Sequence, residues 1–159
     1  MLDEIKNETN TIIQRDLLMD AIDTVDDEMT EYASTLLEDS NVDLAGAAYV
    51  VVLNGDPEQA DELIAMATDR IQSDPLFSGK LLWALMTRFD KPERRFIEEL
   101  LSWAASNEYY EVVRDVAMRL ADFHHTEDTL VAMIQDMVDS SDMQASVREE
   151  TEYFLEQLD

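Results

Sequence analysis

A spacing of 34 residues links three basic residues of this chain, and it constrains the fold more than any other feature. Arg114 follows Lys80 by 34 residues and precedes Arg148 by the same distance. Two series of mainly apolar residues share this period: Met29, Leu63, Ile97 and Val131, and Tyr32, Met66, Leu100 and Ile134. Self-similarity at one period of this length indicates supersecondary units stacked into an array.

Each repeat is predicted to hold two helices, because apolar residues recur at the helical spacing i, i+3, i+4 and i+7. The first helices are expected at residues 24–39, 57–72, 92–106 and 126–140. The second helices are expected at residues 42–54, 75–89, 109–123 and 143–157. Asp56 and Pro57 form a typical helix start. A further helix at 9–22 would cover the first repeat.

The composition favours an all-α fold. Three glycines and three prolines are few for 159 residues, and a sheet protein with many tight turns would need more. A chain of this length suits one domain with its own core. We therefore expect a single helical-repeat domain over 1–159, with an N-terminal capping helix in 1–23 and repeats in 24–159.

An acidic residue stands six positions before each base of the 34-residue series. The pairs are Asp74 and Lys80, Glu108 and Arg114, and Asp142 and Arg148. Arg114 and Arg148 also follow a valine. This pattern resembles the HEAT repeats of the armadillo/HEAT-like group, which carry an acid in the turn between paired helices and Val-Arg six residues later. The resemblance covers residues 57–159, whereas the earlier repeat has Ser40 and Gly46 at the equivalent places.

The resemblance implies a right-handed α-solenoid of about four HEAT-like helical hairpins plus an N-terminal capping helix. It also implies that each base reaches an acidic residue of its own or a neighbouring turn. A structural ladder of charge-assisted hydrogen bonds would then run along the stack. The alternative is that the three bases contact a ligand anion. Because this scaffold serves many tasks, the resemblance predicts binding without naming a partner.

The chain offers no catalytic motif. It lacks cysteine, a glycine-rich phosphate loop, and the GxSxG and HExxH patterns. Its two histidines, His124 and His125, are adjacent in an expected linker, where two neighbouring side chains rarely point at one metal. We therefore predict no catalytic residue, no metal site and no cofactor, and a binding protein instead of an enzyme.

The formal charge of −26 is concentrated at the two ends of the chain. Residues 1–74 hold 19 acids and three bases, residues 124–159 hold ten acids and one base, and the middle is nearly neutral. Such a field repels nucleic acid and anionic membranes, and it accelerates encounter with a basic partner. Without an apolar run long enough for a membrane span, or a recognisable signal peptide, the sequence predicts a cytoplasmic protein.

The acidic surface is the first of two predicted binding surfaces. It would bind and inhibit a basic protein such as a nuclease or a nucleic-acid-binding enzyme. Immunity and anti-defence proteins that mimic DNA act in this way. The residues expected to matter most are Asp23, Asp27, Glu28, Glu31, Asp61 and Glu62.

The second predicted surface is an apolar strip on the concave side of the solenoid, where such arrays usually bind. Here the protein would be an assembly scaffold or adaptor that holds a partner helix or a second copy of itself, and the oligomeric state stays open. The acidity would then reflect solubility or adaptation to salt. The strip would contain Val50, Val51, Leu81, Ala84 and Leu85.

Overall fold

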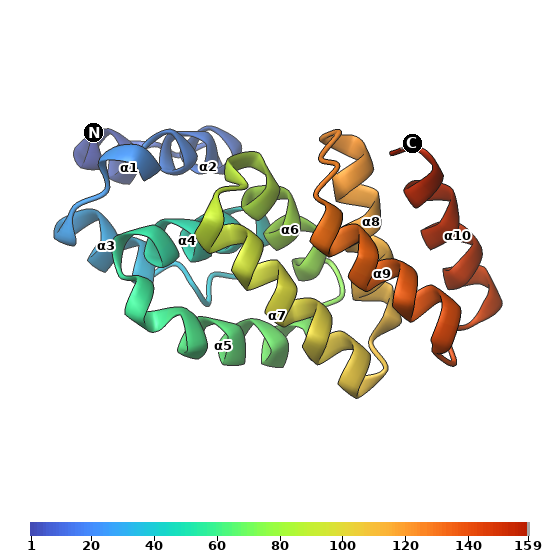
Figure 1. The fold of residues 1–159 in the computed structure, drawn as a ribbon. Helices are drawn as coiled ribbons and strands as arrows, with labels where there is room; N and C mark the ends of the chain where they lie inside the picture. Colours follow the sequence, from blue (N-terminus) through green and yellow to red (C-terminus); the bar gives the residue numbers. More distant parts are fainter. Residues whose placement is uncertain (159) are drawn as a thin grey trace. The chain divides into compact units, whose positions relative to one another are not determined.

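The structure, a computed structural model, describes residues 1–158, and every regular element in this range is helical (Figure 1). The prediction of an all-α fold is confirmed. The α-helices are α1 (Leu2–Asn7), α2 (Thr11–Asp20), α3 (Asp27–Ser34), α4 (Val42–Gly55), α5 (Ala60–Ser73), α6 (Phe77–Arg88), α7 (Lys91–Asn107), α8 (Tyr110–Asp122), α9 (Asp128–Ser140) and α10 (Ala145–Glu156). Two short 3-10 helices, η1 (Ile22–Thr24) and η2 (Pro57–Gln59), precede α3 and α5.

A helix is present at each place where the sequence predicts one. The first helices of the four pairs are α3, α5, α7 and α9, and the second helices are α4, α6, α8 and α10. Two details differ from the prediction. Helix α3 ends at Ser34 and not at the predicted residue 39. The next N–H, that of Thr35, donates to the carbonyl three residues earlier, that of Tyr32, which also accepts a hydrogen bond from Thr35 Oγ1 at 2.6 Å. The N-terminal region contains α1 in addition to the expected capping helix.

Several helices begin at a polar side chain that accepts hydrogen bonds from the free backbone N–H groups of the first turn. Asn10 Oδ1 accepts from the Ile12 N–H at 3.0 Å at the start of α2. Asp26 Oδ1 accepts from the Met29 N–H at 2.8 Å before α3, and Asn41 Oδ1 accepts from the Leu44 N–H at 3.1 Å before α4.

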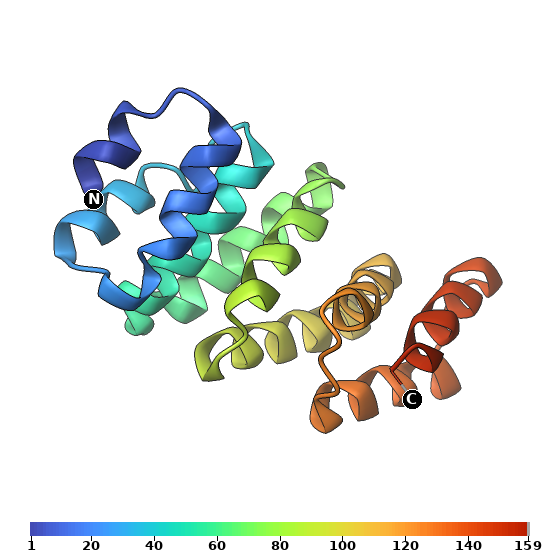
Figure 2. The same ribbon diagram turned by 90° about the horizontal axis from the view of Figure 1, so that it is seen from above.

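The chain divides into two compact units, Met1–Arg94 and Arg95–Asp159, with the boundary inside α7. In the N-terminal unit, α2, α3 and α6 pack against α4 (Figure 2). In the C-terminal unit, α8 and α10 pack side by side, and α9 contacts both. Since compactness alone does not show whether the units fold separately, the single domain over 1–159 stays a prediction.

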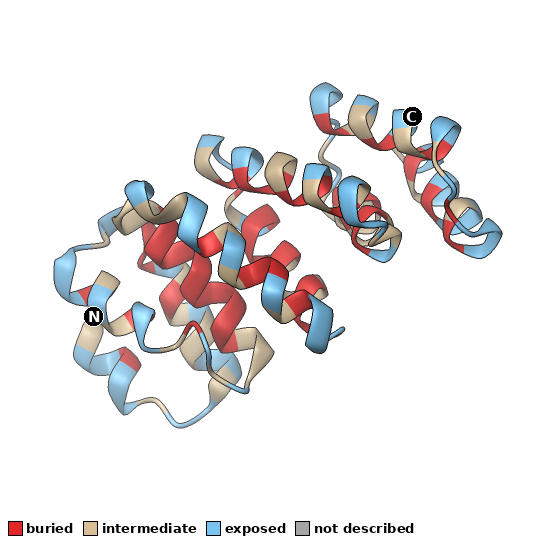
Figure 3. Ribbon diagram, turned by 90° about the horizontal axis from the view of Figure 1, so that it is seen from below, coloured by how far each residue is buried: buried red, intermediate tan, exposed pale blue. Residues whose placement is uncertain are grey.

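Helix α4 forms the core of the N-terminal unit. All ten residues from Leu44 to Leu53 are buried (Figure 3). Gly46 allows the close approach of α6, because a Cβ atom at this position would lie 3.0 Å from the Lys80 carbonyl oxygen. Gly46 stands one period before Lys80. A long basic side chain is absent from this repeat because the backbone of α6 occupies the space.

Candidate functional site

Acidic residues gather around the carboxyl end of α4. Gly55 in the last turn of α4 lies against the side chain of Thr30 in α3. The same end of α4 also packs against η2, which leads directly into α5. The first turns of α3 and α5 therefore lie at one end of the N-terminal unit. We call this region the acidic end and define it by Asp23, Asp27, Glu28, Glu31, Asp61 and Glu62, all of which are exposed.

Most carboxylates of the acidic end have no cation beside them. Asp23 Oδ1 pairs with Arg88 at 2.8 Å. The other five carboxylates form no ion pair or hydrogen bond with any residue in 1–158. The chain has no lysine or arginine between Arg15 and Arg70, a stretch that holds fifteen Asp and Glu residues. The carboxyl end of α4 adds the negative end of a helix dipole, whereas the first turns of α3 and α5, which carry four of these carboxylates, lie at positive dipole ends. The region is thus strongly negative and open to a cationic ligand.

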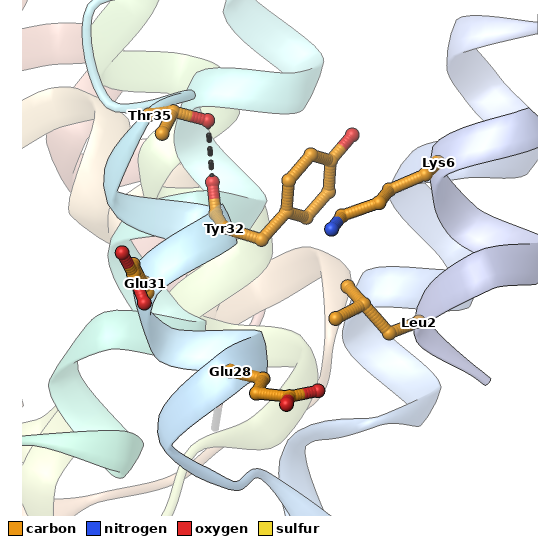
Figure 4. Close-up of a pocket in the computed structure, with 6 residues that line it drawn as sticks. All are labelled: Leu2, Lys6, Glu28, Glu31, Tyr32 and Thr35. Carbon is orange, nitrogen blue, oxygen red and sulfur yellow. Dashed lines mark hydrogen bonds between the residues drawn. The ribbon is translucent and has the colours of Figure 1, made fainter.

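A shallow pocket of about 460 Å³ borders the acidic end between α1 and α3. Figure 4 shows Leu2 and Lys6 of α1 pointing toward Tyr32 of α3. The Lys6 ammonium lies 5.3 Å from the centre of the Tyr32 ring, a cation–π contact. Gln14 Nε2 fixes the ring by donating to the Tyr32 hydroxyl at 3.0 Å. Glu28, Glu31 and Thr35 complete the lining.

A cation of the chain itself, the Lys6 ammonium, already occupies the aromatic face of this pocket. Two carboxylates that form no ion pair among residues 1–158, Glu28 and Glu31, line its other side. The sequence predicted Glu28 and Glu31 as binding residues but missed Lys6 and Tyr32. Helix α1 buries only Ile5 and has too few residues for a periodic apolar pattern.

The three bases of the 34-residue series have partners other than the predicted ones. Lys80 Nζ lies 3.4 Å from Asp43 Oδ1, and Arg114 lies 3.4 Å from Asp115 and 3.8 Å from Glu150. Arg148 donates to two backbone carbonyls of the turn before α10, those of Ser141 at 2.9 Å and Met143 at 3.3 Å. No ion pair within residues 1–158 joins a base to the acid six positions earlier.

The acids of the predicted ladder lie elsewhere. Asp74 Oδ2 pairs with Arg70 at 3.5 Å, within its own helical hairpin. Glu108 is exposed and has a φ of 61°, since it ends α7 in the left-handed conformation. Asp142 is also exposed. The predicted pairing of Asp74, Glu108 and Asp142 with Lys80, Arg114 and Arg148 is therefore wrong, because Asp74 pairs with Arg70 and each base has a nearer acceptor elsewhere.

The predicted apolar strip is wrong as well. Its residues are at most 1% exposed, because α4 and α6 pack directly against each other. A partner helix would have to separate these helices to reach them. The residues concerned are Val50, Val51, Leu81, Ala84 and Leu85.

A buried carboxyl group, Glu93, was not predicted as a special residue. It is 0% exposed, and its Oε1 accepts a hydrogen bond from Asn54 Nδ2 at 3.2 Å. Arg88 Nε lies 4.0 Å from the same oxygen. Burial raises the pKa of the Glu93 carboxyl above its ordinary value, and the hydrogen bond from Asn54 and the charge of Arg88 oppose this effect only in part.

Within the described residues, no three His, Asp or Glu side chains are grouped to hold a metal ion. His124 is exposed with a φ of 55°, while the ring of His125 stacks on Phe123 at 5.7 Å. Each helix in residues 1–158 is too short or too polar to cross a bilayer.

Comparison with known proteins gives no relative on which a family assignment would rest. No protein-family model, no curated protein and no solved structure matches the chain. The resemblance to HEAT repeats therefore stays a prediction from the sequence pattern.

Proposed function

We propose that this chain binds a basic protein through its acidic end and inhibits it, without chemistry of its own. The partner class is a nuclease or another nucleic-acid-binding enzyme, whose cationic site the carboxylates would fill in place of phosphates. Immunity and anti-defence proteins provide the functional type. Neither nucleic acid nor membrane is a partner in this proposal, because both are anionic.

The proposed scaffold is a HEAT-like α-solenoid. Its support is the packing of second helices on one another within each compact unit, α4 on α6 and α8 on α10. Consecutive second helices contact each other in this way when helical hairpins stack. A rigid stack would hold the carboxylates at fixed spacings, which favours the recognition of a matching row of cations.

The observation that carries the proposal is the set of exposed carboxylates without partners around the carboxyl end of α4. A carboxylate that is already paired gains little from a new cation, whereas Asp27, Glu28, Asp61 and Glu62 keep their full charge for a partner. Their shared location at one end of the N-terminal unit would allow several ion pairs within one interface.

The test compares two variants with the same net charge. The first carries Asp27→Asn, Glu28→Gln, Asp61→Asn and Glu62→Gln. The control neutralises four exposed acids of the C-terminal unit: Asp128→Asn, Asp136→Asn, Glu149→Gln and Glu152→Gln. Each protein would be used to capture basic proteins from the native source, and the captured enzyme would then be assayed for inhibition.

We expect the first variant to bind the captured enzyme roughly a hundredfold more weakly than the wild type, since several close charge pairs would be lost. The control should retain both binding and inhibition. Equal weakening in the two variants would mean that only the total charge matters. Unchanged inhibition by the first variant would contradict the proposal.

A further inference from the structure

A second, smaller pocket of about 260 Å³ lies in the N-terminal unit, away from α1. The turn that follows α3, helix α4 and helix α5 all contribute to it. It combines an aromatic hydroxyl, apolar side chains and charged side chains of both signs. Its main lining residues are Leu37, Glu38, Tyr49, Met66, Asp69 and Arg70.

Tyr49 forms the innermost part of this pocket. Its side chain is 2% exposed, and its ring lies 5.5 Å from the ring of Phe77. The hydroxyl forms no hydrogen bond with any residue in the described range. Burial raises the pKa of Tyr49 to about 12, against the opposing charge of Arg70, so the hydroxyl stays protonated and can both donate and accept a hydrogen bond. The hydroxyl lines the pocket, so a ligand seated there could hydrogen-bond to it.

Arg70 lines the pocket, but its guanidinium is already hydrogen-bonded within the chain. Its guanidinium donates to the Leu37 carbonyl at 3.2 Å and to the Asp39 carbonyl at 2.7 Å. It also lies 4.6 Å from the centre of the Phe77 ring and 3.5 Å from Asp74. These contacts use most of its N–H donors, so an anionic ligand would find few free N–H groups there, although the charge of Arg70 still acts on the Tyr49 hydroxyl.

Two exposed carboxylates, Glu38 and Asp69, stand at the opening. Both line the same pocket as Tyr49, and together their two negative charges outnumber the one positive charge of Arg70 in the lining. Neither forms an ion pair among residues 1–158. Leu37 and Met66 give the pocket apolar flanks. A ligand that fits must therefore have an apolar stem and a cationic end that donates hydrogen bonds.

We propose that this pocket binds the side chain of a lysine presented by a partner protein. The methylene stem would pass Leu37 and Met66, and the ammonium would donate to the Tyr49 hydroxyl between the carboxylates of Glu38 and Asp69. A lysine fits better than an arginine, because a single hydroxyl acceptor suits a compact ammonium on a flexible stem better than a planar fork. This site shares no residue with the acidic end, so it stands independently of the proposed function.

The binding test uses three small probes and the full chain. They are lysine capped as its N-acetyl methylamide, norleucine capped in the same way, and inorganic phosphate. Backbone amide NMR would follow each titration. We expect the capped lysine to shift the amide signals of Tyr49 and Arg70, and the other two probes to leave them unchanged. Equal shifts with capped norleucine, or shifts with phosphate in place of lysine, would overturn the proposal.

Variants then locate the bound ammonium. Tyr49→Phe keeps the ring and removes the hydroxyl, and Asp69→Asn changes an exposed side chain that contributes nothing to the core. Each should weaken binding of the capped lysine roughly tenfold, the usual effect of losing one hydrogen bond to a charged group. Glu58→Gln removes one exposed charge from η2 and should change nothing. Wild-type affinity in both pocket variants would refute this site.

Discussion

Three helices end in residues that adopt the left-handed conformation despite carrying a side chain: Phe89 ends α6 with a φ of 46°, and two further residues of this kind share a hydrogen-bond pattern. Glu108 has a φ of 61° after α7, and His124 has a φ of 55° at the end of α8. In each case the next N–H donates back into the helix at 2.9 Å, from Tyr109 to the Ala104 carbonyl and from His125 to the Leu120 carbonyl. Glycine usually occupies this position, because a Cβ atom raises the energy of this conformation.

We predict that Glu108→Gly stabilises the protein. Relief of the left-handed strain should exceed the added entropy of the unfolded chain, for a net gain of about 0.5–1 kcal/mol. Chemical denaturation would measure it, with Glu108→Gln as a control that removes the charge and leaves the backbone strain. If both substitutions destabilise the fold, the Glu108 carboxylate has a supporting role of the kind that the predicted ladder required.

Glu93 makes the stability of the fold depend on pH. Its pKa is higher in the folded state than in the unfolded state. The resulting contribution to the free energy of unfolding is therefore fully present below the ordinary carboxyl pKa, and it is lost as the pH rises through the pKa of the folded state. Glu93→Gln keeps an oxygen that accepts from Asn54 and cannot ionise. We expect this variant to melt at a higher temperature than the wild type near neutral pH, and at the same temperature in acid.

The exposed Glu58 provides the control, since Glu58→Gln should shift the melting temperature little at any pH. A wild type that is more stable than Glu93→Gln at neutral pH would show that Arg88 stabilises the ionised carboxylate more than burial penalises it. The sign of the difference therefore decides which of the two effects is larger.

At the level of the helix, apolar spacing and helix-start residues were enough to predict most elements. Helix α8 was expected at 109–123 and occupies Tyr110–Asp122. The spacing did not show what covers an apolar helix, so Leu81 and Leu85 were assigned to an exposed strip although both lie in the core. The partner of Arg148 also depends on the path of the turn before α10. Arg148 donates hydrogen bonds to two backbone carbonyls of this turn and forms no ion pair with the Asp142 carboxylate.

The contact between α4 and α6 gives a prediction for Gly46. Replacing glycine by alanine inside a helix normally stabilises it by roughly 0.5–1 kcal/mol. Here the added Cβ would press on the Lys80 carbonyl at 3.0 Å, and a backbone atom cannot move aside cheaply. We expect Gly46→Ala to destabilise the protein by about 1–3 kcal/mol. A gain in stability on chemical denaturation would show that the two helices separate easily.

At the scale of the whole chain, the charge of −26 should weaken the folded state at low salt through self-repulsion. The screening length falls from ~10 Å at 0.1 M salt to ~3 Å at 1 M. We therefore expect the melting temperature to rise with sodium chloride and to level off below molar concentration. A rise that continues through several molar would favour salt adaptation as the origin of the acidity.

Of the candidate site, only the acidic residues could be predicted from the sequence, because they are recognised by their charge alone. Counting acids and bases was sufficient to select Glu28 and Asp61, because exposed helix starts commonly carry acids. Their gathering at the end of α4 depends on the contact of Gly55 with Thr30, and the pocket at Tyr49 depends on where Arg70 is anchored. Both are properties of tertiary packing, which periodicity does not contain.

The central position of α4 also bears on how the protein is made. Helix α4 leaves the ribosomal exit tunnel before α6, its largest packing partner, has emerged. For that interval the nascent chain carries one of its most apolar segments with a face uncovered, a state prone to aggregation. Pausing of translation while α6 is still inside the tunnel would prolong this exposure, whereas pausing after α6 has emerged would leave time for it to pack on α4.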